Sequence, residues 1–292
     1  TIQAALDAST SGDTVLVYEG TYKECIKING GRYVKSQFDS SSDSTAIKNT
    51  IIECTGSNSI EIKGSDLEGF SLTGKGIVMN GASTIKHLLI SGRIDGGLGW
   101  MIHVDTDADA TIKDTKIINN KGGGIRITGG KLTGKNIVIS NNSKVWGAVG
   151  FSCSSTSTQV SADSDIIAHL ENIRIANNYG FGSGVTGGAM HIGINCDVTV
   201  LNGEFYDNLI LDDSKSYYHG GSVYLYSNAA LNLVNVTSVN NRALSVNADS
   251  DTTIGPSIAL GHPSHNPVFE GKLTISNSII YDNLQEISAW GG

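Results

Sequence analysis

The chain has 292 residues, 39% of them hydrophobic, so it can bury a continuous core and is not a disordered segment. The formal net charge is -8 and the sequence has no run of basic residues, so it lacks the clustered positive charge that a nucleic-acid-binding protein needs. No apolar stretch approaches the length of a membrane-spanning helix, so we expect no membrane insertion in this segment. The 36 glycines and only 3 prolines indicate a chain that turns often but keeps its backbone donors for strand pairing.

The first hundred residues predict a short helix followed by irregular strands. Residues 1–9 (TIQAALDAS) read as an amphipathic helix that would cover one end of a core. Residues 85–90 resemble the seven-residue phrase that recurs later in the chain, with His87 at the position where that phrase usually has Asn. The strand-like segments before it begin at Val15, Cys25, Thr50 and Ser59.

From residue 114 onward, one seven-residue phrase recurs six times. Each copy opens with Asn or Asp, alternates apolar and polar residues, and closes on Asn, which is typical of a strand with one buried face. The intervals between closing residues are 22, 36, 30, 33 and 42, which indicates a repeating coil with loop insertions. The closing residues are Asn120, Asn142, Asn178, Asn208, Asn241 and Asn283.

A second phrase, usually introduced by glycine, lies between these strands. Aligning its six copies produces two columns that are apolar in every copy, and this agreement predicts the register between coils. The first column is Ile102, Ile125, Val149, Met190, Val223 and Ile258. The second column is Val104, Ile127, Phe151, Ile192, Leu225 and Leu260.

Strands this short cannot bury their own apolar face, so successive repeats must stack with neighbouring strands ~4.8 Å apart. Stacking makes every strand parallel to its neighbours and creates a continuous interior. The closing asparagines then lie one above another at a turn, where their amides are expected to form a hydrogen-bonded Asn ladder.

The opening segment TIQAALDASTSGDTVLVYEGTYKE resembles the N-terminal entry of the pectin-lyase-like right-handed β-helix superfamily. The glycine phrases at Gly187 and Gly220, with F-x-x-N at 205–208, are similar to the repeats of polymorphic outer-membrane protein and adhesin-type β-helices. We therefore expect an all-β, right-handed parallel β-helix of about ten coils with a short N-terminal capping helix. The superfamily includes lyases, hydrolases, tailspikes and adhesins, so the resemblance does not decide function.

We expect a single β-helix domain over residues 1–292. It would comprise the capping helix at 1–9, less regular coils over 10–98, and regular coils with loop insertions over 99–292. The sequence stops just after a coil without an evident polar cap. We therefore expect it to be part of a longer protein, with other copies or further domains at its C-terminal end.

The four cysteines predict two disulfides between adjacent coils. Cys153 and Cys196 emerge at nearly the same corner, one coil apart, and Cys25 and Cys54 are also separated by about one coil. Two disulfides indicate an oxidising compartment and a secreted or cell-surface protein, with four buried free thiols as the alternative. Two sequons that permit N-glycosylation in a eukaryotic host begin at Asn141 and Asn235.

The residues that point outward between the two apolar columns form the candidate site. In coil order they are His103, Arg126, Gly150, His191, Tyr224 and Ala259, with Tyr226 one step further and Trp100 and Trp146 at the flanks. We expect neighbouring members to lie ~4.8 Å apart and a shallow gap to lie over Gly150. Arg binds carboxylates and aromatic rings stack on sugars, so an acidic or neutral glycan is the expected ligand. The alternative is a set of ordinary exposed sheet residues.

We assign no catalytic residue. Pectate lyases, whose fold this sequence resembles, hold calcium with clustered acidic residues. The sheet predicted from the second phrase contains only one such residue, Asp105. Polygalacturonases use three carboxylates with Gly-His-Gly and Arg-x-Lys motifs, which the Asp pair at 212–213 and His219 match incompletely. No cofactor or metal is expected. Calcium at the acidic stretches 105–109 and 247–251 is the alternative to solvated turns.

The sequence thus favours an extracellular structural or adhesive β-helix module of a secreted, cell-surface or filament-forming protein that contacts glycans along an exposed sheet face. A polysaccharide lyase or glycoside hydrolase acting on acidic polysaccharide is the alternative. Expected partners are a polysaccharide or glycoprotein.

Overall fold

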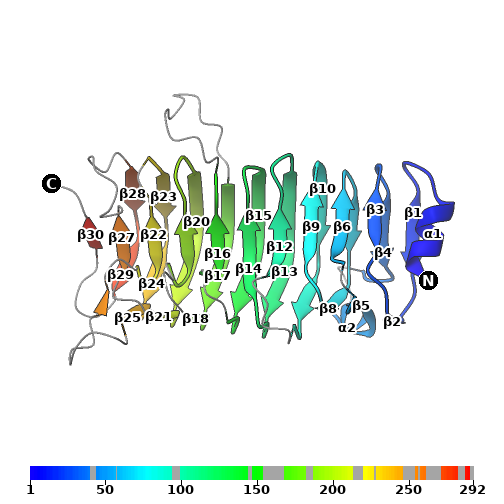
Figure 1. The fold of residues 1–292 in the computed structure, drawn as a ribbon, viewed down its shortest axis with the longest axis horizontal. Coiled ribbons are helices and arrows are strands. Elements are labelled where there is room, and N and C mark those ends of the chain that lie inside the picture. Colours follow the sequence, from blue (N-terminus) through cyan, green and yellow to red (C-terminus); the bar gives the residue numbers. More distant parts are fainter. Residues whose placement is uncertain are drawn as a thin grey trace.

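A computed structural model describes residues 1–39, 44–56, 58–93, 99–143, 147–153, 168–181, 187–212, 220–226, 228–245, 254–255, 257–260, 271–281 and 287–289. In these residues the chain forms an elongated right-handed parallel β-helix, with its coils side by side along one long axis (Figure 1). Helix α1 (Ile2–Ala8) lies at the N-terminal end of this axis.

One face of the solenoid is a 10-stranded sheet to which each coil contributes one strand. We call it the front sheet. Its strands are β3 (Lys27–Asn29), β6 (Ile60–Lys63), β9 (Ile77–Asn80), β12 (Trp100–Val104), β14 (Gly123–Ile127), β16 (Val149–Phe151), β19 (Met190–Ile192), β22 (Val223–Leu225), β27 (Ile258–Leu260) and β30 (Ile287–Ala289).

The other wall is a 16-stranded sheet, the back sheet. Its main path is β1 (Thr14–Val17), β4 (Tyr33–Ser36), β7 (Asp66–Glu68), β10 (Ala82–Lys86), β13 (Asp109–Ile118), β15 (Lys131–Ser140), β17 (Ala168–Ala176), β20 (Asp197–Tyr206), β23 (Ala230–Val234) and β28 (Lys272–Ser276). Beside that path lie β2 (Gly20–Tyr22), β5 (Thr50–Cys54), β8 (Ser71–Gly74), β11 (Leu89–Ser91), β24 (Thr237–Val239) and β29 (Ile279–Tyr281).

Two features were not predicted from the sequence. A third sheet of 4 strands contains β18 (Tyr179–Phe181), β21 (Leu209–Asp212), β25 (Arg242–Ser245) and β26 (Ile254–Gly255). A second helix, α2 (Thr45–Asn49), precedes β5. Both lie in segments of irregular length between the repeated phrases, where the repeat period does not predict secondary structure.

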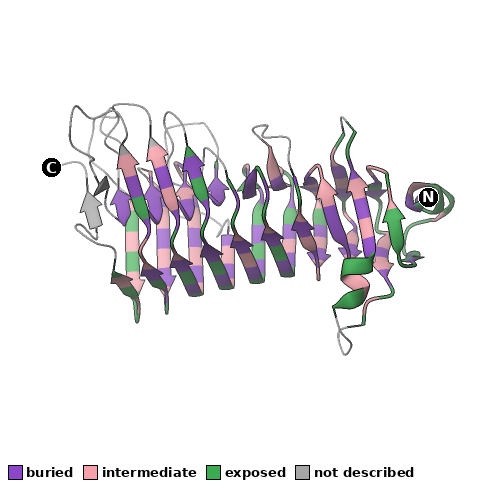
Figure 2. Cartoon of the chain, turned by 90° about the horizontal axis from the view of Figure 1, so that it is seen from below, coloured by how far each residue is buried: buried purple, intermediate pink, exposed green. Residues whose placement is uncertain are grey.

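The predicted core columns are confirmed. Ile125 pairs with Ile102 on one side and with Val149 on the other, and the same register continues through Met190 and Val223. All of these side chains are buried. Figure 2 shows the resulting alternation of buried and exposed residues along the strands. The two-residue strand period therefore sends every second side chain into one continuous interior.

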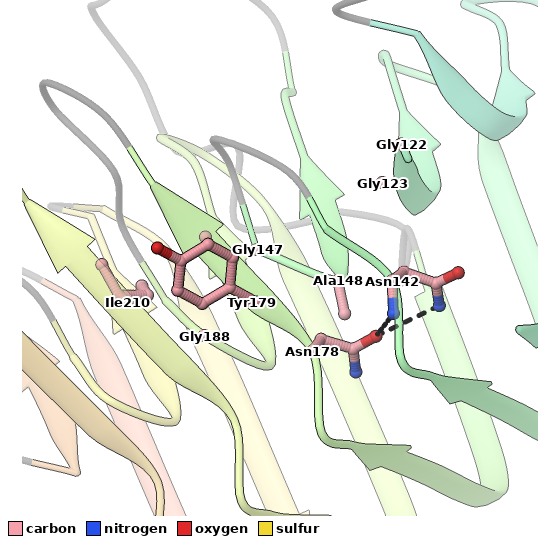
Figure 3. Close-up of a pocket in the computed structure, with 10 residues that line it drawn as sticks. Gly122, Gly123, Asn142, Gly147, Ala148, Asn178, Tyr179, Gly188 and Ile210 are labelled. Carbon is pink, nitrogen blue, oxygen red and sulfur yellow. Dashed lines mark hydrogen bonds between the residues drawn. The ribbon is translucent and has the colours of Figure 1, made fainter. Parts of the chain in front are cut away.

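The closing asparagines form the predicted ladder. The backbone N–H and the Nδ2–H of Asn142 both donate to Oδ1 of Asn178, each at 3.1 Å (Figure 3). Asn178 donates in the same way to Asn208, and its Nδ2–H also reaches the carbonyl of Ile139 at 3.0 Å. The pattern spans Asn120, Asn142, Asn178, Asn208 and Asn241, all buried. Asn283 lies outside the described residues.

A second, exposed ladder runs through the residues that open each phrase. Nδ2–H of Asn172 donates to Oδ1 of Asn136 at 3.0 Å, and Asn202 donates to Asn172 at 3.1 Å. Asn136, Asn172 and Asn202 all have φ near +55°, as does His87 in the earlier coil. Asn tolerates this left-handed conformation, which bends β15, β17 and β20 within a continuous strand.

The N-terminal end is covered by α1, as predicted. Ile2 and Leu6 are buried against the core, and Thr1 caps the helix by accepting a hydrogen bond from the N–H of Ala4. The Glu24 carboxylate accepts from the N–H groups of Ile2 and Gln3. Neither helix in the described part of the chain has the length and apolar character that a membrane span requires.

Both predicted disulfides are present. Cys25 bonds to Cys54 and Cys153 bonds to Cys196, with Cα–Cα distances of 4.6 and 5.3 Å. Each bond joins segments of different coils, as the register predicted. The two bridges are consistent with an oxidising compartment.

We predict that Asn178→Ala lowers the free energy of unfolding by about 3 kcal/mol, because buried partners in two neighbouring coils lose their hydrogen bonds. The matched control is Asn172→Gly, which removes an exposed ladder side chain at a positive φ that glycine accepts, and should cost less than about 1 kcal/mol. Urea unfolding followed by circular dichroism measures both. Equal losses would contradict a special role for the buried ladder.

Candidate functional site

The outward residues of the front sheet lie in the predicted order. His103 pairs with Arg126, Arg126 with Gly150, Gly150 with His191, and His191 with Tyr224. These residues therefore form one column across five consecutive strands, from β12 to β22. The surroundings of individual members differ from the simple exposed stripe that the sequence predicted.

At the N-terminal side of the column, His103 is half-buried and Arg126 is exposed. One ring nitrogen of His103, Nε2, lies 3.0 Å from Oγ1 of Thr128 on the next coil. Burial lowers the pKa of His103, the charge of Arg126 lowers it further, and Asp105 opposes them. At neutral pH this imidazole is uncharged, so Arg126 carries the positive charge of the pair.

The gap predicted over Gly150 is wrong, because Trp100 fills it. A Cβ built on Gly150 would lie 2.9 Å from Cη2 of the Trp100 ring, and one built on Gly123 would lie 2.3 Å from Cε3. The indole therefore lies across the outer face of the two following coils, on positions that lack side chains. Trp100 remains partly exposed. Trp146, the other predicted flank, lies outside the described residues.

At the other end of the column, His191 is in contact with two tyrosine rings. It stacks on Tyr224 with ring centroids 5.9 Å apart and meets the edge of Tyr226 at 5.4 Å. The prediction that Tyr224 is an exposed contact for a ligand is wrong, because its side chain is only 1% exposed. Tyr224 is instead a buried neighbour of both residues, since its ring also meets the Tyr226 ring at a centroid distance of 5.1 Å.

The environment of this cluster shifts its protonation equilibria. Burial lowers the pKa of His191 to about 4, and the charge of Arg126 contributes to the decrease. Burial raises the pKa of the Tyr226 hydroxyl. At neutral pH the pair therefore consists of an uncharged imidazole, able to accept a proton, and a protonated phenol, able to donate one.

A cleft of about 760 Å³ opens where the front-sheet strands end. It is lined by Thr106, Thr128, Gly129, Phe151, Ser152, Cys153, His191, Gly193, Ile194 and Tyr226. This set contains hydroxyls, an imidazole and apolar surface but no carboxylate. Thr128 and Ser152 directly follow Ile127 and Phe151 of the second apolar column, and the sequence assigned them no role. The disulfide at Cys153 joins two of the coils that form the wall.

The expected calcium alternatives gain no support in the described part of the chain. Among those residues, no three His, Cys, Asp or Glu side chains come together in a way that could hold a metal ion, and this includes the stretch 105–109. The stretch 247–251 and His219 lie outside the described residues. A second cavity, beside the Asn ladder at Asn142 and Asn178 (Figure 3), measures about 10 Å³ and is at most large enough for one water molecule.

The predicted glycosylation positions are both at the surface. Asn141 and Asn235 are exposed, each with φ near +55°. Nδ2–H of Asn235 donates to Oδ1 of Asn202 in the exposed ladder at 3.1 Å. Modification at either position stays a prediction.

Comparison with known proteins supports the fold. No family model and no curated protein matches the sequence. Among solved structures, the chain is similar to an alginate lyase from Paenibacillus sp. strain FPU-7, with a TM-score of 0.51 and 14% identity over 99% of this chain and 95% of that one. It is also similar to a galactohydrolase named for galactose-4-sulfate and 3,6-anhydro-galactose-2-sulfate units, with a TM-score of 0.50 and 13% identity over 98% and 85%.

These likenesses define the class of fold, a parallel β-helix, which is the fold that the sequence predicted. At such low identity they extend to the fold alone. The chemistry of the front sheet must therefore be argued from its own residues.

We predict that protonation of His191 lowers stability in acid. Its ordinary pKa is 6.5 and its folded pKa is about 4, so between these values the unfolded state binds more protons than the folded state. Stability therefore falls as the pH drops through this window, by about 2 kcal/mol after allowance for the partial exposure of the ring.

Urea unfolding at pH 7 and at about pH 4 measures this loss. His191→Gln should remove most of it. His169→Gln, on the outer face of the back sheet, should leave it in place because His191 is intact. An unchanged pH dependence in His191→Gln would contradict the assignment.

Proposed function

We propose that the protein is an extracellular β-helix module that binds an acidic polysaccharide in the cleft at the end of the front sheet. The observation that carries this proposal is the combination of a large open cleft with Arg126 beside it. The cleft lining offers hydroxyls from Thr106, Thr128 and Ser152, which suit the hydroxyl groups of a sugar.

The charge pattern favours an acidic ligand. Arg126 is exposed, and its charge acts on both His103 and His191. A guanidinium binds a carboxylate through two parallel hydrogen bonds, so Arg126 suits the carboxylate of a uronic acid. The described cleft lining itself contains no carboxylate, and the nearby Asp105 directly precedes Thr106 at its edge.

The same features support a structural or adhesive role of the whole module. Continuous strand pairing, two asparagine ladders and two disulfides make a stiff rod, and the binding surface lies along one side of it. A secreted or cell-surface location would expose that surface to polysaccharides or glycoproteins.

The pairing of His191 with Tyr226 favours a second candidate, a polysaccharide lyase. In β-elimination, Arg126 would neutralise the uronate carboxylate and the neutral His191 would take the proton from the adjacent ring carbon. The released electron pair would form the carbon–carbon double bond as the bond to the leaving sugar oxygen breaks. The Tyr226 hydroxyl would then give its proton to that oxygen. Hydrolysis receives less support, because two carboxylates are needed and the described cleft lining contains none.

We predict that Arg126→Ala weakens binding to polygalacturonate or alginate by roughly 10- to 100-fold, the loss expected for one charge-assisted contact. The matched control is Arg174→Ala, which removes an exposed arginine from the back sheet that pairs with Glu204. Affinity electrophoresis in gels that contain each polymer measures the retardation. Equal behaviour of the two variants, or no retardation of the native protein by either polymer, would overturn the proposal.

Catalysis is tested separately by incubating the protein with the same polymers and recording the ultraviolet absorbance of unsaturated uronate products. A lyase should form such products, and His191→Gln and Tyr226→Phe should abolish them while polymer binding persists. Binding of native protein without product would eliminate the lyase and leave the binding module.

A further inference from the structure

We propose that Trp100 is a second sugar-binding position outside the cleft, so that the front sheet takes an oligosaccharide that runs from the cleft, past Arg126, to the indole. The inference rests on the proposed function and specifies the length and course of the ligand. Its basis is the way the sheet positions this one ring.

Two glycines allow the indole to lie against the sheet. The three atoms closest to a Cβ built on Gly123 all belong to the Trp100 ring, at 2.3 to 2.9 Å, and so do those closest to a Cβ on Gly150, at 2.9 to 3.7 Å. Any larger residue at either position would push the ring away. The sheet thus holds the indole across two neighbouring coils while part of its surface remains accessible.

The indole reaches the row of Arg126, two residues along the strands from the cleft. A Cβ built on Gly150 would lie 2.9 Å from Cη2 of the ring, and Gly150 pairs with Arg126 on the neighbouring strand. Thr128 and Ser152 in the cleft wall each lie two residues further along these strands. Two residues of a strand span about 7 Å. A sugar ring that fills the cleft therefore leaves the indole to the neighbouring sugar of the chain, so a disaccharide or longer oligomer contacts both positions.

The charges along this path define the ligand further. Among the described residues of β12, β14, β16, β19 and β22, Arg126 is the only Lys or Arg. His103 and His191 are neutral at pH 7. One carboxylate at Arg126 and the uncharged face of a neighbouring sugar on the indole fit a uronic-acid oligomer, which carries one carboxylate on each sugar. A chain with several sulfates on each sugar would place more anions beside this single cation.

The test uses the monomer, dimer, trimer and hexamer of galacturonic acid, and the same series from alginate, in isothermal titration calorimetry. Native protein should bind the dimer and the longer oligomers at least tenfold more tightly than the monomer. Trp100→Ala should lose this gain, roughly tenfold for one aromatic contact, and keep the affinity for the monomer. A length dependence that survives in Trp100→Ala overturns the inference while the proposed function stands. Absence of binding at every length overturns both.

A second variant separates ring position from ring loss. Gly150→Ala keeps Trp100 but displaces the indole, and Gly150 has no positive φ that alanine would strain. It should reduce the affinity for the hexamer as Trp100→Ala does. The double variant should bind no worse than Trp100→Ala, because the added methyl group then meets no ring. Additive losses in the double variant would contradict the positioning role of Gly150. Circular dichroism and thermal unfolding confirm that each variant is folded.

Discussion

The structure depends on the stacking of parallel strands one coil apart, held in register by a column of buried asparagine amides. From Asn142 to Asn241, each side-chain carbonyl in that column accepts two hydrogen bonds from the preceding coil, and each amide nitrogen also reaches a backbone carbonyl. A slip of one coil against the next would leave these buried groups unsatisfied, which is costly in an apolar interior. Because the register is held in this way, residues that are far apart in the sequence become fixed neighbours on the outer face.

The front sheet uses that regularity to place unlike residues side by side. Two glycines in the outward positions leave room for the indole of Trp100, and the buried ring of Tyr224 contacts His191 and Tyr226. Burial keeps both imidazoles uncharged at neutral pH, so Arg126 is the positively charged residue of the column, and Asp105 is a nearby negative charge that acts on His103. The scaffold is regular, and its surface becomes chemically specific because equivalent positions in one column carry different residue types.

The structural neighbours include a lyase and a hydrolase, yet the fold is compatible with binding as well as with catalysis. The distinction depends on proton transfer within the cleft, where a neutral His191 and a protonated Tyr226 lie close together. A rigid binding module needs only the shape and charge of this surface. A lyase needs in addition that both groups reach the reacting atoms of the sugar.

The sequence by itself determined the β-helix, the inward columns, the order of the outward column, the Asn ladder and both disulfides. Each of these follows from the repeat period, because a strand has one buried face and stacked coils place equivalent positions together. Only the tertiary structure decided that Tyr224 is buried, that Trp100 covers Gly150, and that a cleft and a third sheet exist. These features depend on side-chain directions and on insertions of irregular length, which the period of the repeat does not encode.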